Sequence, residues 1–539
     1  MKLKARPYLH YAPVSGGVYF AAARGQLVLR GSELLFRVAD RVVPLLETGA
    51  TEDELVAAVG DERSRKVVRH IVDHLRAKDL LLDYAAHTAA EPGEEERRAF
   101  GGPLAYLESL SDDPYAAFAR LRTATVVVVG DGPAARAATR GLLRAGIGEV
   151  RDPDPADPYA GADAAVLVDG DPGAAPVSLP VVPVVLADRA LLAGPALAGP
   201  AFTGAASWRA FRERALNRAE TDGVAPAARP VADALAGALA AHLLVAELAG
   251  IAELGAAYVV HGAELTADRV VVTAPGHDER WHTLEDAPPT ALPSRPETVD
   301  SLAELVAPWT GRAVRGSAEE ELPQLPLSQR ELVRRDGATG SVFAWAPDLE
   351  SATVGVALAL LRESVPGGAA GLSEQLWLLD GALRHLTGLA RPVGPATVAD
   401  MARETYRIHQ IFTSAYAGEH VLRALAVPHV DWRLVRVETA GGELLGAAWG
   451  PDLDTAIRYA VGTALHAYQV RALRPDRLGA PPVRTDALVF AGDDVVDALR
   501  KQVLGGAAAD GLRYRGRSLG DPVLGNLPVW YGPVEAVTR

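Results

Sequence analysis

The stretch from Val126 to Val150, VVVVGDGPAARAATRGLLRAGIGEV, constrains the fold more than any other part of the chain. A run of four valines ends at Gly130, and a helical pattern follows over residues 134–145 and closes at Gly146. A buried strand, a glycine-rich turn and a helix, in that order, open a nucleotide-binding α/β fold, in which amides at the helix N-terminus approach phosphate. The turn alone is weak evidence for a nucleotide. The stretch therefore predicts a Rossmann-type sheet and leaves its chemistry open.

Length and composition place this sheet in a multidomain chain. The 539 residues correspond to about three domains of roughly 150 residues each, and 49% hydrophobic with 23% charged residues is enough for packed cores. No membrane span or signal-peptide core is expected, so we expect a cytoplasmic protein. The absence of cysteine excludes disulfides, thiolate zinc sites and a cysteine nucleophile. A net charge of −14 without a basic stripe argues against nucleic acid as a partner.

Two breaks divide the chain. The first, near residues 88–103, is acidic and poor in apolar residues, and the second, near 285–298, contains four prolines within 285–296. Proline at that density opposes both helices and central strands. We therefore predict an α+β and α/β multidomain protein with domains at residues 1–84, 104–284 and 298–539.

The first domain has a readable order of elements. A capping box at Thr51 and Glu54 starts its second helix, and apolar residues from Val67 to Leu75 form one stripe on its third. The expected strands are Tyr8–Val14, Val18–Ala22, Gln26–Arg30 and Leu80–Leu82, and the expected helices are 34–46, 55–59 and one containing 67–75. Three strands, three helices and a returning strand predict a small winged helix-turn-helix.

DNA binding is the first function that such a domain suggests. Its third helix is basic, but it also carries Asp73, His70 and His74, which favours a folded unit without DNA contacts. The strand Gln26–Arg30 offers a different use, because an exposed edge strand can accept a peptide as an added strand. On this interpretation Leu29→Pro is expected to abolish peptide capture by removing a strand amide.

Four segments of this domain resemble the precursor-recognition domain of ribosomal peptide-modifying systems: RPYLHYAPV, GVYF, GQLVLRGSELLFRVADRVVPLLETGATEDELVAAV and VRHIVDHLRAKDLL. In that family the leader of a precursor peptide joins the sheet beside the third helix. The resemblance covers residues 1–84 and implies the following peptide-binding residues: Gln26, Leu27, Val28, Leu29, Arg30, Lys66, Arg69, His70, Asp73 and His74.

The segment from Gly130 to Val150 resembles the start of a ThiF-like adenylating domain. Adenylation needs acids for ribose and magnesium, a cation at the phosphates and usually a downstream cysteine. The available acids, Asp152 and Asp154, lie among prolines, and Tyr159–Asp163 replaces the Asn-Leu-x-Arg-Gln type of segment. We therefore expect a scaffold that no longer adenylates and binds no cofactor. Downstream, four residues that could contact a metal fit no strong zinc motif, so no metal is expected: His277, Asp278, Glu279 and His282.

Two segments of the third domain, residues 343–363 and 446–471, each predict a strand, a Pro-Asp turn and an amphipathic helix. They resemble the two helical motifs of the YcaO family, which uses ATP to form azoline rings. Magnesium needs hard oxygen ligands, yet of the two glutamate positions of the first motif only Glu363 is kept, and the first falls at Leu360. The glutamate expected in the second motif falls at His466, with Gln469 and Arg471 retained. The resemblance thus implies a degenerate YcaO-like domain.

One further pair of histidines lies in the same domain. His409 and His420 fall in a stretch, Ala402–Leu425, that we expect to be helical, and their spacing of eleven residues puts them on a similar face. Together with Glu419 they form a candidate site, although a structural role is favoured.

Together the three resemblances imply the partner protein of a split azoline-forming system of the thiopeptide type. Such a protein binds the precursor leader and docks onto a separate YcaO cyclodehydratase, without catalytic residues of its own. The alternatives are that the chain is itself an ATP-dependent adenylating or cyclodehydrating enzyme, or a DNA-binding regulator. The sequence leaves open the precursor, the product, the docking surface and whether the chain forms a homodimer.

Overall fold

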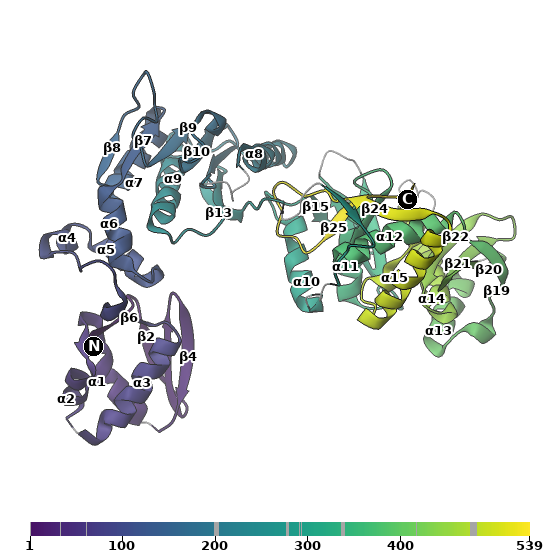
Figure 1. Cartoon of the computed structure of the whole chain (residues 1–539), viewed down its shortest axis with the longest axis horizontal. Coiled ribbons are helices and arrows are strands. Elements are labelled where there is room, and N and C mark those ends of the chain that lie inside the picture. Colours follow the sequence, from purple (N-terminus) through teal and green to yellow (C-terminus); the bar gives the residue numbers. More distant parts are fainter. Residues whose placement is uncertain are drawn as a thin grey trace. The chain divides into compact units, whose positions relative to one another are not determined.

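The computed structural model describes residues 2–32, 34–60, 62–198, 204–275, 280–289, 292, 294–335, 340–416, 418–474 and 482–539. The chain divides into two compact units, Met1–Val272 and Thr273–Arg539, and each contains both helices and sheets (Figure 1). The predicted mixed α and β multidomain class is therefore confirmed.

The N-terminal part of the first unit consists of two small sheets and three helices around one core. One sheet has the strand order β2-β3-β4 and the other β5-β1-β6. The elements are β1 (Lys2–Ala5), β2 (His10–Val14), β3 (Gly17–Ala22), β4 (Gly25–Arg30), α1 (Leu34–Thr48), β5 (Ala50–Thr51), α2 (Glu52–Val59), α3 (Arg65–Ala77) and β6 (Leu81–Asp83).

Local signals in the sequence correspond to local structure here. The predicted capping box is present, since the Thr51 side chain accepts from the Glu54 amide and the Glu54 carboxylate accepts from the Thr51 amide. Gly60 ends α2 in the left-handed conformation, with a φ of 82°. The stripe of α3 is buried at Val68, Ile71, Val72 and Leu75. Strand β1 was not expected from the sequence, and it pairs with both β5 and β6.

The stretch near residues 88–103, where the sequence predicts the division between the first two domains, contains one helix and the start of a second. Helices α4 (Glu94–Ala99), α5 (Gly101–Leu110) and α6 (Pro114–Thr123) lie between the N-terminal sheets and the central sheet. Lys4 of β1 forms a 2.7 Å ion pair with Glu108 of α5. Buried Arg6 donates to the carbonyl oxygens of Glu108 and Ser111, each at 2.8 Å. The N-terminal sheets are thus joined to α5 by charged hydrogen bonds.

The central sheet has seven strands in the order β13-β12-β11-β10-β9-β7-β8. Strands β8, β7, β9 and β10 are parallel, and β11, β12 and β13 continue the sheet in antiparallel pairs. Its elements are β7 (Thr125–Val129), α7 (Gly132–Ala145), β8 (Glu149–Arg151), β9 (Ala164–Val168), β10 (Val181–Leu186), β11 (Ala190–Ala193), α8 (Gly204–Thr221), α9 (Val231–Ala249), β12 (Ala256–His261) and β13 (Thr266–Val271).

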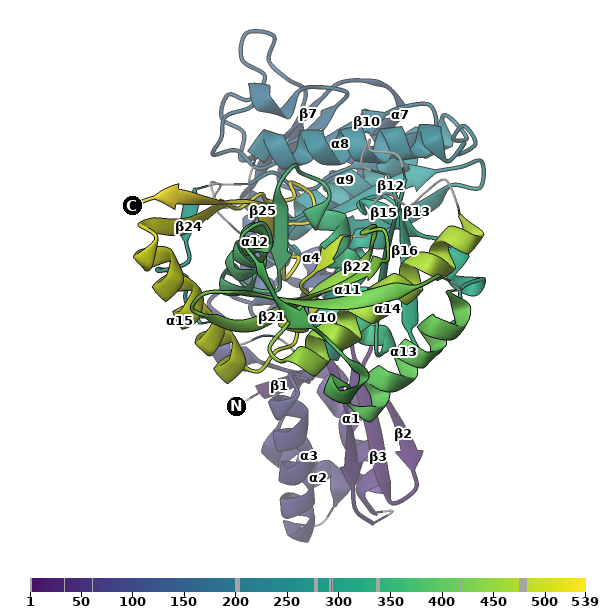
Figure 2. The ribbon, with the colours of Figure 1, turned by 90° about the vertical axis from the view of Figure 1, so that its right-hand side faces the viewer.

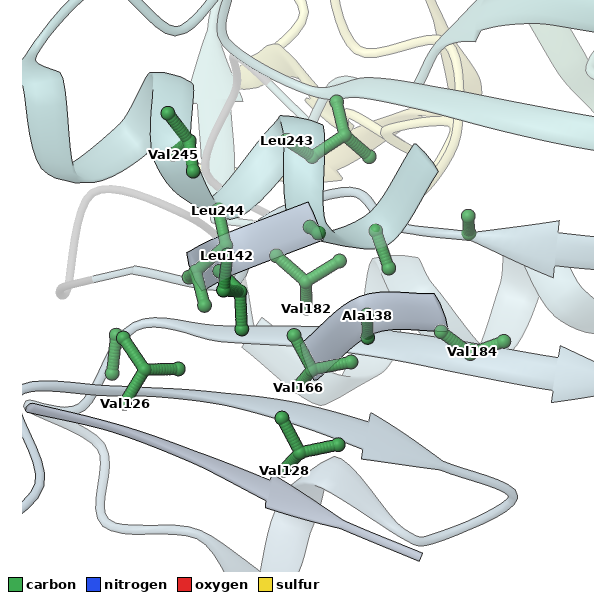
Figure 3. Packing of buried hydrophobic residues seen from close by; sticks show 14 of the residues in the cluster. Val126, Val128, Ala138, Leu142, Val166, Val182, Val184, Leu243, Leu244 and Val245 are labelled. Carbon is green, nitrogen blue, oxygen red and sulfur yellow. The ribbon is translucent and has the colours of Figure 1, made fainter. Parts of the chain in front are cut away.

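Helix α9 is the core helix of this sheet. By length and composition it is the one described helix apolar enough to be considered as a membrane span. Its residues Leu243, Leu244 and Val245, however, pack in the same cluster as Val126 and Val166 of the sheet, as Figure 3 shows. Burial against strands is the ordinary setting of an apolar helix, and we interpret α9 accordingly.

The second unit contains three sheets, with strand orders β14-β24-β25-β18, β15-β16-β17 and β19-β20-β21-β22-β23. Its elements are β14 (Trp281–Thr283), α10 (Arg295–Leu302), β15 (Ala313–Arg315), β16 (Ser328–Arg334), β17 (Ser341–Ala346), α11 (Leu349–Arg362), β18 (Gly368–Gly371), α12 (Glu374–Thr387), β19 (Arg391–Pro395), α13 (Arg403–Ala415), β20 (His420–Val427), β21 (Val430–Thr439), β22 (Leu444–Gly450), α14 (Leu453–Leu473), β23 (Val483–Arg484), α15 (Asp493–Ala509), β24 (Leu512–Arg517) and β25 (Trp530–Thr538).

Two strand–turn–helix segments recur in this unit, as the sequence predicts. Asp348 caps α11 by accepting from the Ser351 amide at 2.8 Å, and Asp452 caps α14 by accepting from the Thr455 amide at 2.8 Å. Helix α14 packs on β21 and β22, with α13 beside it (Figure 2). Each Pro-Asp turn therefore ends a strand and starts a helix, because the aspartate satisfies an amide that the first helical turn leaves free.

The close packing of α9 on α7 depends on Gly237. A Cβ atom there would lie 2.0 Å from the Ala134 carbonyl oxygen. We expect Gly237→Ala to lower the free energy of unfolding by about 1–3 kcal/mol, because the helices must separate. Urea unfolding followed by circular dichroism measures the change. Gly102→Ala is the control, since nothing lies within 4 Å of its Cβ position. An equal stability of the Gly237→Ala variant and the native chain would contradict the packing.

Candidate functional site

Strand β4 is an edge strand, and its register determines which backbone groups are free. It pairs with β3 alone among the described strands. The strands are joined by a two-residue turn, so Ala22 and Gly25 form a hydrogen-bonded pair and such pairs recur at every second residue. The 2.8 Å hydrogen bond from the Gly31 amide to the Gly16 carbonyl continues the same series of pairs. The amides and carbonyls of Gln26, Val28 and Arg30 consequently point away from β3, toward the free edge.

The side chains of β4 alternate between the core and the surface. Leu29 is 4% exposed and belongs to the N-terminal core, whereas Val28 is 50% exposed. Gln26 accepts a 2.7 Å hydrogen bond from the Tyr19 hydroxyl of β3 on the outer face. The strand is therefore held to the core by one face while its edge stays open.

The register shows that Leu29→Pro is not a suitable test of peptide capture. The amide of Leu29 belongs to a hydrogen-bonded pair with Val18 of β3. Leu29→Pro would break the β3–β4 hairpin itself and would not report on an added strand. Val28 is instead one of the residues whose amide faces the edge.

The expected binding residues of α3 all lie on its exposed surface: Lys66, Arg69, His70, Asp73 and His74. Arg69 forms a 2.7 Å ion pair with Glu52 of α2, and the rings of His70 and His74 are 4.3 Å apart. No hydrogen bond or ion pair within the described residues joins these five side chains to β4. The end of α3 nevertheless lies beside the start of β4, because a Cβ at Gly25 would be 3.1 Å from the Lys78 carbonyl oxygen.

The glycine-rich turn after β7 leads directly into helix α7. Gly130 has a φ of 114°, and a Cβ there would lie 2.9 Å from the Val168 side chain. Asp152 and Asp154 follow β8 and are both exposed, and Asp154 accepts the amide of its own turn at Ala156. The connection from β8 to β9 contains no helix. The turn is thus present, while the nearby acids are occupied locally or turned to solvent.

The residues at the expected magnesium positions differ in burial and in their partners. Leu360 is fully buried. Glu363 follows the last residue of α11 and lies 3.6 Å from Arg334 in an ion pair. His466 is buried and donates through Nδ1 to Gln329, which in turn donates to Gln469 at 2.8 Å. Burial lowers the pKa of His466 to about 3, with a smaller contribution from Arg484. A neutral histidine therefore replaces the expected carboxylate.

The remaining histidine candidates differ from expectation. His409 lies on α13 but His420 begins β20, so the predicted continuous helix over Ala402–Leu425 is wrong. Their Nε2 atoms are nevertheless 3.4 Å apart, and burial and the neighbouring His420 lower the pKa of His409. Glu419 does not complete a site, since no group of three or more metal-binding side chains occurs among the described residues.

The four residues after β13 that could contact a metal are only partly described. His282 is buried and its Nδ1 lies 3.0 Å from Glu374 Oε1, while the other three lie outside the described residues: His277, Asp278 and Glu279.

The fold of this chain is similar to that of solved proteins. No family model and no curated protein sequence matches the chain. A solved heterocyclase in complex with substrate and cofactor is similar over 99% of this chain and 94% of its own, with a TM-score of 0.52 and 14% identity. The heterocyclase TruD matches with a TM-score of 0.49 and 16% identity, over 99% of this chain and 94% of TruD. MccB of E. coli with ATP matches over 50% of this chain and 97% of MccB, with a TM-score of 0.37 and 12% identity. We base the comparison on the first, which shows that the whole chain has a heterocyclase-like fold.

The lowered pKa of His466 predicts how the stability of the fold depends on pH. Its folded-state pKa lies below the ordinary value, so between about pH 6.5 and 3 the unfolded chain binds more protons than the folded one. The contribution of His466 to stability is complete above that window and is lost as the pH falls through it. We expect His466→Gln to show a shallower loss of stability between pH 6.5 and 4.5, measured by urea unfolding. Parallel curves for the two proteins would contradict a buried neutral histidine.

Proposed function

We propose that the chain is a peptide-binding partner protein, which captures the leader of a ribosomal precursor through β4 and delivers the core segment to a separate YcaO cyclodehydratase. On this proposal residues 1–84 form a winged helix-turn-helix recognition domain, residues 104–284 a ThiF-like domain that does not adenylate, and residues 298–539 a degenerate YcaO-like domain. The reaction served is thiazoline or oxazoline formation in a pathway of the thiopeptide type.

The free edge of β4 is the observation that carries this proposal. An added strand can pair with the outward amides and carbonyls of Gln26, Val28 and Arg30, which are otherwise left to water. Exposed Val28 offers an apolar contact on the outer face, and the end of α3 bounds the strand at Gly25. Backbone hydrogen bonds supply affinity in this mode, and neighbouring side chains supply selectivity.

The residues at the expected ATP positions support a role without catalysis. A leucine cannot bind magnesium, and a buried histidine with a lowered pKa carries no charge near neutral pH. The fold similar to a heterocyclase then serves as a platform for docking. Holding the leader near a second enzyme can raise avidity by about 10²–10⁴ without new contacts at the reacting atoms.

Val28→Pro tests the edge directly. The substitution removes one outward amide but no hydrogen bond between β3 and β4, so the hairpin should survive. We expect the affinity for the labelled leader, encoded by a short reading frame beside the gene, to fall by about tenfold or more. Fluorescence anisotropy measures the affinity.

Val28→Ala is the matched control, because it shortens the same side chain and keeps the amide. Its affinity should remain within a few-fold of the native value. Equal binding by the proline and alanine variants, with both folded by circular dichroism, would remove β4 from the binding site.

The rival enzymatic function has its own readout. Purified chain incubated with precursor and ATP, in the absence of any other protein, should release no phosphate above background and should form no azoline ring detectable as a loss of water by mass spectrometry. Turnover by the chain alone would overturn the partner-protein proposal even if leader binding were intact.

A further inference from the structure

The second unit encloses a cavity of about 490 Å³ between α11, α12 and β23. Three arginines from these elements line it: Arg362, Arg384 and Arg484. The side chains of Arg362 and Arg484 are only 9% and 4% exposed. Buried guanidinium groups are costly unless their charge and donors are matched, so the partners of each determine what the cavity can hold.

Two carboxylates balance two of the three charges. Asp380 lies between Arg362 and Arg384, with Nε–Oδ distances of 3.0 and 3.2 Å. Asp486 pairs with Nε of Arg484. The other acidic residue at the cavity, Glu363, has a half-exposed side chain and faces Arg334. The cavity is therefore left with an excess of one buried positive charge.

The free hydrogen-bond donors at the cavity also indicate a lack of negative charge. Among the described residues the hydrogen bonding of Arg362 is confined to its Nε, which donates to Asp380. Its two terminal nitrogens are thus donors without acceptors in a side chain that lines the cavity. Burial, together with the positive charge of Arg362, lowers the pKa of Arg384. Despite burial, Asp380, Asp486 and Glu363 already raise the pKa of Arg362, so the free terminal nitrogens of Arg362 and the lowered pKa of Arg384 are what favour a further negative charge at this wall.

We propose that this cavity binds a compact oxyanion, either a phosphate ion or the phosphate group of a larger ligand. Its charge neutralises the excess at Arg362, Arg384 and Arg484, and its oxygens accept from their terminal nitrogens. Planar guanidinium groups suit tetrahedral oxyanions because they donate two parallel hydrogen bonds. Peptide capture at β4 does not use this cavity, so the two proposals stand or fall separately.

Calorimetric titration of the full chain with inorganic phosphate tests the site, at constant ionic strength in a chloride buffer. We expect one phosphate per chain for the native protein. Arg384→Gln removes the excess charge and leaves Asp380 paired with Arg362 and Thr485, so its affinity should fall by about tenfold or more. Arg391→Gln is the matched control, because Arg391 is an exposed arginine of β19 away from the cavity, and its binding should be unchanged.

A second variant tests the site independently, in case Arg384→Gln does not fold. His385 is exposed and lies at the rim of the cavity, and His385→Glu should weaken phosphate binding by repulsion while leaving the circular dichroism spectrum unchanged. ADP titrated into phosphate-free and phosphate-saturated protein identifies the source. Competition with phosphate indicates a nucleotide phosphate, and no ADP binding indicates the free ion. Absence of phosphate binding to the native chain would overturn the proposal, and so would native affinity in both folded variants, Arg384→Gln and His385→Glu.

Discussion

The free edge of β4 is the constraint on which the account of this protein depends. Backbone amides and carbonyls must be paired or hydrated, and the two-residue turn before β4 leaves those of every second residue unpaired. Leu29 anchors the strand in the core, so the edge is presented by a fixed element rather than by a mobile loop. Buried hydrogen bonds from Arg6, which follows β1, connect the N-terminal sheets to α5 and the residue after it. A peptide held at the edge would therefore be held relative to the central sheet.

Short-range patterns predict much of this fold, and long-range contacts account for what they miss. The capping box of α2 and the stripe of α3 were recognisable because their partners lie within a few residues. Strand β1 was not, since its alternation of lysine with Leu3 and Ala5 spans only four residues and its main partner, β6, lies some eighty residues later. His420 was assigned to a helix because the strand that it begins, HVLRALAV, shows no strict alternation of polar and apolar residues.

The second unit keeps the expected strand–turn–helix elements but not the carboxylates expected on two of its helices. Its two Pro-Asp turns cap α11 and α14 as the sequence predicts. The fold of the whole chain is similar to that of a heterocyclase, yet Leu360 and His466 place an apolar and a neutral side chain where carboxylates were expected. The arginine-lined cavity could not be read from the sequence, because Arg362, Arg384 and Arg484 come from three separate elements. A similar fold and the absence of the expected carboxylates are compatible, because packing and chemistry depend on different residues.

Residue-resolved amide hydrogen exchange of β4, with and without the precursor leader, tests most directly whether the leader binds as a strand at the β4 edge. Leader bound as an added strand should slow exchange at Gln26, Val28 and Arg30, and should change Leu27 and Leu29 little, since their amides already pair with β3. This alternation is specific to strand addition at the edge. Leader binding that leaves the three outward amides unprotected, or that protects β4 uniformly, would contradict the account.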